Sequence, residues 1–377
     1  MINKKLKVGN VPNLRFPEFT EEWKTKKLGE VATNVMYGMN AAATNYDGEN
    51  QYIRITDIDE QTRLFCPNPL SSPDGELDNK YLLHKGDILF ARTGASVGKS
   101  YLYNEKDGKI YFAGFLIRLN VGDEDPYFIF SQTLTEKYQR WVLTMSMRSG
   151  QPGINAEEYK LLPIFIPSIQ EQDKISSFLL LIDERIQTQN KIIEQLETLI
   201  KGLCQKLILK QVPNKKLSDC VSCYSSSLTE SNVIDKNGVY PVYGATGIIA
   251  FTENHQIDEA AILIIKDGSG VGKVQYASDK FSVIGTLNYL TVKLDANLKY
   301  IFFCLKYFNF EKYKVGSGIP HIYFKDYGET FIYCPPLEEQ NEIESLLSSI
   351  DSKINIETQY LKELKEQRKF LFQQMFV

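Results

Sequence analysis

The chain has 377 residues, of which 43% are hydrophobic and 24% charged, and its formal net charge is −4. This composition is typical of a folded protein that is long enough for two or more domains. No apolar run reaches the roughly 18 residues that a membrane span needs, and the start MINKKLKVGN lacks a signal-peptide core. We therefore expect a cytoplasmic protein that does not contact a membrane. Three scattered histidines and six irregularly spaced cysteines argue against catalytic residues or a metal site.

The first 166 residues are predicted to form a mixed α+β domain. Patterns typical of strands occupy residues 51–58, 87–94 and 110–119, and a helical pattern follows at 127–143. Within this part, ARTGASVGK resembles a phosphate-binding loop, but three residues separate Gly94 from Gly98 where such a loop has four. The spacing favours a β-hairpin with Lys99 near its tip. An enzyme that uses a nucleoside triphosphate remains the minor alternative.

A long helix is predicted for residues 167–210. Its apolar residues recur at alternating spacings of four and three, which is the heptad pattern of a coiled coil, and no proline interrupts the run. Further apolar residues flank this seam, so the helix needs another partner as well. The predicted seam residues are Ile175, Leu179, Ile182, Ile186, Gln189, Leu196 and Leu203.

The second half of the chain repeats this order. Residues 211–334 form a second predicted domain, with strands at 239–251, 261–268 and 288–294 and a helix at 298–308. The stretch KDGSGVGK repeats the earlier glycine-rich turn and predicts a second hairpin near Lys273. Residues 335–377 form a second long helix, whose predicted seam residues are Ile343, Leu347, Ile350, Ile354, Glu357, Leu364 and Leu371.

The two halves are an internal repeat. Pro167 and Pro335 stand 168 positions apart, and the sequences after them match in register to the end of the chain. The same offset superimposes the polar seam residues Gln189 and Glu357. A polar residue in an apolar seam fixes register, so we expect the two helices to pair with each other. The alternative is that each helix lies separately on its own domain.

This organisation predicts a bivalent reader. Two similar domains on a rigid spacer can bind the two halves of one ligand, and duplex DNA with two half-sites is a suitable ligand. The negative net charge argues against nucleic acid, but residues 335–377 hold eight acidic and five basic side chains, so most of the excess lies there. The alternative is a coiled-coil scaffold that does not bind DNA.

The chain resembles the specificity (S) subunit of type I restriction-modification systems over essentially its whole length. The resemblance rests on LRFPEFTEEWKTKKLGEV at residues 14–31, YIRITDI at 52–58, GDILFARTGASVGK at 86–99, and the twin P-x-x-x-E-Q-x-x-I starts at 167 and 335. No counterpart of RFPEFTEEW is evident in the second half.

The resemblance implies a non-catalytic subunit. Its target-recognition domains, 1–166 with the N-terminal segment and 211–334, would read a bipartite double-stranded DNA target. The helices 167–210 and 335–377 would pair as an antiparallel coiled coil, set the spacing and dock two methyltransferase subunits. Restriction/translocase subunits would join them. S-adenosylmethionine, ATP and Mg²⁺ would act in these partners, with no cofactor in this chain.

The candidate DNA contacts are residues whose side-chain chemistry suits DNA, because the base-reading residues of this family cannot be transferred by motif. They flank glycine-rich turns, where the backbone can approach DNA closely. Lysine at a hairpin tip suits a phosphate, whereas arginine or glutamine suits a base edge, and a solvated surface charge is the alternative for each. The candidates are Arg92, Lys99, Arg148 and Gln151 in the first domain and Lys266, Lys273, Lys314 and His321 in the second.

Overall fold

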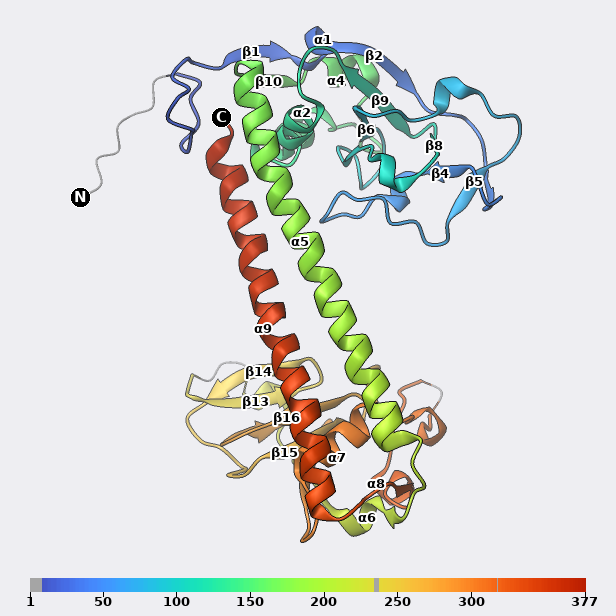
Figure 1. Ribbon diagram of the computed structural model, residues 1–377, viewed down its shortest axis with the longest axis vertical. Coiled ribbons are helices and arrows are strands. Elements are labelled where there is room, and N and C mark those ends of the chain that lie inside the picture. The colour runs from blue at the N-terminus through green and yellow to red at the C-terminus, as the bar shows by residue number, and fades with distance from the viewer. Residues whose placement is uncertain (1–8, 234–236, 317) are drawn as a thin grey trace, which may run out of the picture. The chain divides into compact units, whose positions relative to one another are not determined.

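The computed structural model describes residues 9–233, 237–316 and 318–377 (Figure 1). The chain divides into two compact units. Unit 1 contains the chain up to Gln187 together with Lys362–Val377, and unit 2 contains Thr188–Leu361. The boundary crosses both long helices, α5 (Ile169–Cys204) and α9 (Leu337–Met375). Each unit therefore takes part of each helix into its own fold.

Unit 1 is built around a four-stranded antiparallel sheet. Its order is β2 (Ala32–Tyr37), β9 (Leu116–Val121), β6 (Asp87–Ala91) and β7 (Ser100–Leu102). Smaller pairs surround it, and their strands are β1 (Lys24–Lys27) with β10 (Pro163–Ile166), β3 (Ala43–Asn45) with β5 (Ser71–Pro73), and β4 (Gln51–Ile53) with β8 (Ile110–Phe112). The helices are α1 (Leu28–Val31), α2 (Pro126–Gln132), α3 (Glu136–Met145) and α4 (Ala156–Lys160).

Two of the elements predicted for unit 1 are longer than the elements that the structure contains. The strand expected at 51–58 ends at Ile53, because the Asp57 carboxylate accepts hydrogen bonds from the Arg54 backbone N–H and guanidinium and closes a turn. The helix expected at 127–143 is two helices. The Thr135 hydroxyl accepts from the Tyr138 backbone N–H and so begins α3 afresh. Side-chain capping therefore overrides the continuous apolar pattern.

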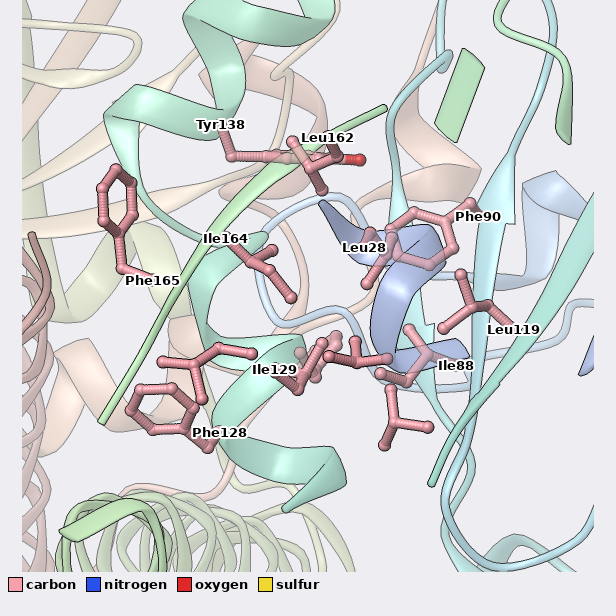
Figure 2. Packing of buried hydrophobic residues seen from close by; sticks show 14 of the residues in the cluster. Leu28, Ile88, Phe90, Leu119, Phe128, Ile129, Tyr138, Leu162, Ile164 and Phe165 are labelled. Carbon is pink, nitrogen blue, oxygen red and sulfur yellow. The ribbon is translucent and has the colours of Figure 1, made fainter. Parts of the chain in front are cut away.

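The core of unit 1 joins distant parts of the chain. Figure 2 shows side chains of the sheet and of α2 meeting around Ile129. The same cluster contains Trp23 from the N-terminal segment, Leu179 from α5, and Phe372 and Phe376 from the end of the chain. Burial of these groups removes a large apolar area from water, which is the dominant stabilising term in folding. The C-terminal end of α9 is thus part of the first domain's core.

Unit 2 repeats the sheet of unit 1. Its order is β12 (Val221–Ser225), β18 (Leu287–Val292), β15 (Ala261–Ile265) and β16 (Val274–Ala277). Three further strands form a separate sheet, β14 (Gly247–Thr252), β13 (Tyr240–Gly244) and β17 (Ser282–Val283). The helices are α6 (Leu217–Cys220), α7 (Leu298–Lys306) and α8 (Phe324–Tyr327).

The first strand and helix after α5 have structural counterparts in unit 1. β11 (Lys215–Lys216) pairs antiparallel with β19 (Phe331–Ile332), and α6 follows it. In unit 1, β1 pairs with β10 and α1 follows in the same way. The strings KKLGEV at residues 26–31 and KKLSDC at residues 215–220 carry this equivalence.

The two predicted hairpins are confirmed. β6 pairs with β7 and β15 pairs with β16, and each turn holds a glycine at positive φ, Gly98 at 86° and Gly272 at 88°. A Cβ atom at Gly98 would lie 2.5 Å from Val142, and one at Gly272 would lie 2.8 Å from Phe310. Glycine is therefore required for both conformation and close approach.

The helix α5 continues directly into a π-helical turn at Gln205–Leu209. In unit 2 the Gln189 side-chain amide donates to the Glu357 backbone oxygen at 3.1 Å and to its carboxylate. In unit 1 the Arg368 guanidinium pairs with Asp183. Of the helices in the described part of the chain, none has the length and apolar character to cross a bilayer.

Candidate nucleic-acid interface

Corresponding strands place a cationic residue at the same position in each unit. Arg92 directly follows β6, and its backbone N–H donates to Phe115 O at 3.1 Å while its carbonyl accepts from Ile154 N at 2.9 Å. Lys266 directly follows β15 and makes the equivalent bonds to Thr286 O at 3.0 Å and from Ile322 N at 2.9 Å. These bonds fix both residues between two loops. Arg92 and Lys266 are therefore structural equivalents.

In unit 1 the arginine lies between aromatic rings. Its guanidinium carbon is 4.9 Å from the Tyr37 ring centroid and 5.9 Å from that of Phe115. Both rings are well exposed, at 40% and 61%. A cation over an aromatic face is attracted by the ring's electron density, so the rings hold the guanidinium in place. We call Tyr37, Arg92, Phe115 and Gln151 the aromatic cluster.

Backbone geometry brings the members of the aromatic cluster together. Gly38 follows Tyr37, and a Cβ there would lie 2.2 Å from Ala113 O, so only glycine lets β2 approach the turn that carries Phe115. The Tyr37 hydroxyl accepts from Ala156 N at 3.1 Å. Gln151 is exposed, and a Cβ built on Gly94 would lie 3.2 Å from its side-chain amide nitrogen. The predicted candidates Arg92 and Gln151 thus flank the same turn.

Unit 2 carries different chemistry at the equivalent position. The Lys266 ammonium donates to Ser225 Oγ at 3.2 Å. Ser225 pairs with Asn288 in the sheet as Tyr37 pairs with Ile117 in unit 1, so Ser225 corresponds to Tyr37. Thr286 accepts from the Lys266 backbone as Phe115 accepts from the Arg92 backbone, so Thr286 corresponds to Phe115. Two hydroxyl side chains therefore replace the two aromatic rings. Beside them, His321 Nδ1 lies 2.7 Å from Asp267 Oδ1. We call Ser225, Lys266, Thr286 and His321 the hydroxyl cluster.

The remaining candidates lie around these clusters. Arg148 already uses part of its hydrogen-bonding capacity within the protein. Its guanidinium donates to Glu158 and, at 3.0 Å, to the carbonyls of Met145 and Met147. Lys314 forms an ion pair with Glu311 at 2.6 Å. Lys273 is exposed and lines a groove with Lys314, Phe310 and the Ala245–Gly247 turn. These placements leave Lys273 as the lysine best able to meet a phosphate.

Lys99 is placed differently from what its sequence context predicts. Its ammonium donates to Ile58 O at 3.0 Å and pairs with Glu60 at 2.7 Å, and its side chain is 8% exposed. The segment around Ile58 folds over the hairpin tip and turns the lysine inward. Lys99 thus supports the fold locally, and its position does not favour contact with DNA.

Sequence reasoning missed Tyr37, Phe115, Ser225 and Thr286. Each lies at or beside a strand end that meets another strand end only in the folded sheet. The one available signal was the tyrosine directly before Gly38. Among residues 9–233, 237–316 and 318–377, no group of three or more histidine, cysteine or acidic side chains is placed to hold a metal ion.

The fold and the two clusters define a tandem recognition protein, in which one domain occurs twice with different side chains at equivalent strand ends. The family comparison gives the same organisation. The chain belongs to the type I restriction modification DNA specificity domain family, whose model matches residues 20–198 and 210–366. This confirms the predicted resemblance and, with it, a role in the DNA specificity of such systems.

Curated relatives and solved structures agree with this family. Two Methanocaldococcus jannaschii proteins are similar over nearly the whole chain. The putative type I restriction enzyme MjaX specificity subunit is 24% identical over 97% of this chain and 93% of its own, and the MjaVIII specificity subunit is 22% identical over 94% and 92%. A type I S subunit from M. genitalium shares the fold with a TM-score of 0.69 at 18% identity, covering 97% of this chain and 99% of the other. A chain from a structural study of the assembly of a type I restriction-modification system gives a TM-score of 0.54 at 17% identity, covering 94% of this chain and 97% of the other.

Proposed function

We propose that each unit reads one half of a bipartite double-stranded DNA target and that this chain is the non-catalytic specificity subunit of its complex in the cytoplasm. The observation that carries this proposal is the pair of equivalent strand ends, one with an aromatic cluster and one with a hydroxyl cluster. One scaffold with different exposed side chains suits the reading of two different sequences. S-adenosylmethionine, ATP and Mg²⁺ then act in the methyltransferase and restriction/translocase partners.

We also propose that α5 and α9 pair as an antiparallel coiled coil that spaces the two domains. The bonds of Gln189 with Glu357 in unit 2 and of Asp183 with Arg368 in unit 1 support it, because a later residue of α5 meets an earlier residue of α9. The core of unit 2 likewise combines Ile200 and Cys204 with Ile343 and Leu347. Of the predicted seam residues outside the two cores, Gln189 and Leu364 are buried, and the others, Ile182, Ile186, Leu196 and Glu357, are half-buried.

In each unit, the exposed apolar residues of these helices are the proposed docking face for one of two methyltransferase subunits. Each residue of this face belongs to α5 or α9 and is at least 47% exposed. Apolar side chains this exposed on a long helix favour contact with another protein. The residues are Leu181, Leu199, Leu346, Ile356 and Phe370.

The deciding experiment is to express the chain with its matching methyltransferase in a methylation-deficient host and to map modified adenines by long-read sequencing. We expect one split motif that is methylated on both strands. If a stable complex forms and no motif appears, DNA reading by this chain is refuted and the scaffold alternative stands.

The hairpin lysines provide a matched pair of variants. Lys99→Ala is expected to lower the free energy of unfolding by about 1–3 kcal/mol, because a buried charged hydrogen bond is lost. The salt dependence of DNA binding should not change, because Glu60 already neutralises this charge. Lys273→Ala should preserve stability and reduce the slope of log affinity against log salt by about 1. Denaturant titration measures the stability of each variant, and DNA titrations at several salt concentrations measure its salt dependence. A stability loss for Lys273→Ala together with a changed salt slope for Lys99→Ala would contradict the roles given to the two lysines.

A further inference from the structure

Arg92 differs from four other arginines of unit 1. Arg15, Arg54, Arg118 and Arg148 each form an ion pair with a carboxylate. For Arg92 the described residues provide two aromatic rings and no such carboxylate, and its Nε is buried without a hydrogen-bond partner. The buried Nε cannot reach a ligand, but a guanidinium that is held by rings and has no counter-ion keeps its Nη donors available for one.

The geometry determines what kind of ligand group fits. Aromatic rings near a guanidinium interact with its π system and its charge, whereas its N–H donors point outward in its own plane. Two parallel N–H donors match the O6 and N7 acceptors that guanine presents in the major groove. The backbone bonds of Arg92 and the neighbouring rings restrict its motion before DNA binds, which reduces the entropy lost on binding.

The equivalent position in unit 2 does not have this chemistry. Lys266 has a compact ammonium that already donates to Ser225, and an ammonium cannot make the two parallel bonds of a guanidinium. The difference between Arg92 and Lys266 therefore predicts a difference between the two DNA half-sites. A guanine contact of this type is expected in the half read by unit 1 and not in the half read by unit 2.

We propose that Arg92 reads a guanine in the first half-site through its major-groove edge and that Tyr37 and Phe115 are positioning residues that hold the guanidinium. This inference rests on the proposed DNA-reading function. The aromatic cluster is thereby a specificity determinant for one base pair, and Gln151 lies where it can contact a neighbouring position.

The test uses the complex of the full chain with its methyltransferase and duplexes of the mapped target. Each guanine of the first half-site is replaced in turn by 7-deazaguanine, which lacks N7, or by inosine, which lacks the minor-groove amino group. At one guanine, 7-deazaguanine should weaken binding of the unaltered complex by about 10- to 100-fold, and inosine should have little effect. The Arg92→Ala complex, which has no side-chain donor at this position, should bind the normal target about 10- to 100-fold more weakly and lose no further affinity with 7-deazaguanine.

Matched controls separate the possible outcomes. Lys266→Arg should leave the 7-deazaguanine effect in the first half-site unchanged, and Phe115→Ala should weaken it in part. Equal sensitivity of the Arg92→Ala and unaltered complexes to 7-deazaguanine, sensitivity to inosine alone, or a first half-site without guanine would overturn the inference. Unaltered complexes that bind target and scrambled duplexes equally would instead refute the proposed function, and the inference with it.

Discussion

Glu171→Ala is expected to lower the free energy of unfolding of unit 1 by about 3–5 kcal/mol. Glu171 is 1% exposed, and its carboxylate accepts from Arg15 Nε and Nη2 at 2.7 Å and from Trp23 Nε1 at 3.2 Å. Arg15 is only 11% exposed, so the substitution leaves a largely buried cation without a partner. It also detaches the N-terminal segment from the first turn of α5.

Tryptophan fluorescence can measure this effect selectively. The chain has two tryptophans, Trp23 and Trp141, and both belong to unit 1. The control is Glu339→Ala at the repeat-equivalent position in unit 2, where the glutamate is exposed and accepts from the Tyr333 hydroxyl at 2.6 Å. Because the sequence of unit 2 contains no tryptophan, far-UV circular dichroism follows the unfolding of this control. We expect a change of no more than about 0.5 kcal/mol for this control. Similar losses for the two variants would show that the buried ion pair does not anchor the segment.

Leu347→Asp is expected to destabilise unit 2 by at least about 4 kcal/mol. Leu347 is fully buried in the cluster that also contains Ile200, Cys204 and Ile343. The substitution removes an apolar side chain from this core and introduces a carboxylate that has no partner there. Far-UV circular dichroism should show an early unfolding transition, while the fluorescence transition of unit 1 should stay in place.

The adjacent residue provides the control on the same helix. Leu346 is 47% exposed, so Leu346→Asp should change stability by no more than about 0.5 kcal/mol. It should nevertheless weaken copurification with the methyltransferase, because it puts a charge into the proposed docking face. Full methyltransferase binding by a stable Leu346→Asp variant would exclude this part of the helix from the docking face.

Residues of α5 and α9 have different roles. Leu347 supports the core of its unit, Leu346 is proposed to meet a partner, and within unit 2 Gln189 of α5 bonds to Glu357 of α9. A loss of DNA specificity without a loss of stability or partner binding would then point to the strand-end clusters. The Arg92→Ala variant is the reference for that class.

The sequence alone determined the repeat, the two hairpins, the long helices and the family. These features depend on residues that are close in the chain: glycines at turns, heptad spacing, and the twin starts at Pro167 and Pro335. Local pattern is sufficient there because turn conformation and helix periodicity are local properties. The boundaries within unit 1 were less predictable, because single capping residues such as Thr135 interrupt otherwise continuous patterns.

Only the tertiary structure decided whether residues at equivalent positions of the repeat have the same surroundings. Lys99 and Lys273 occupy the same position in two hairpins, yet the segment around Ile58 buries the first and the second is exposed. Glu171 and Glu339 differ in the same way, because Arg15 and Trp23 cover only the first. The aromatic cluster assembles from three separate strand ends. Burial and side-chain contact depend on residues distant in the chain, so the repeat could predict equivalent positions but not their equivalent chemistry.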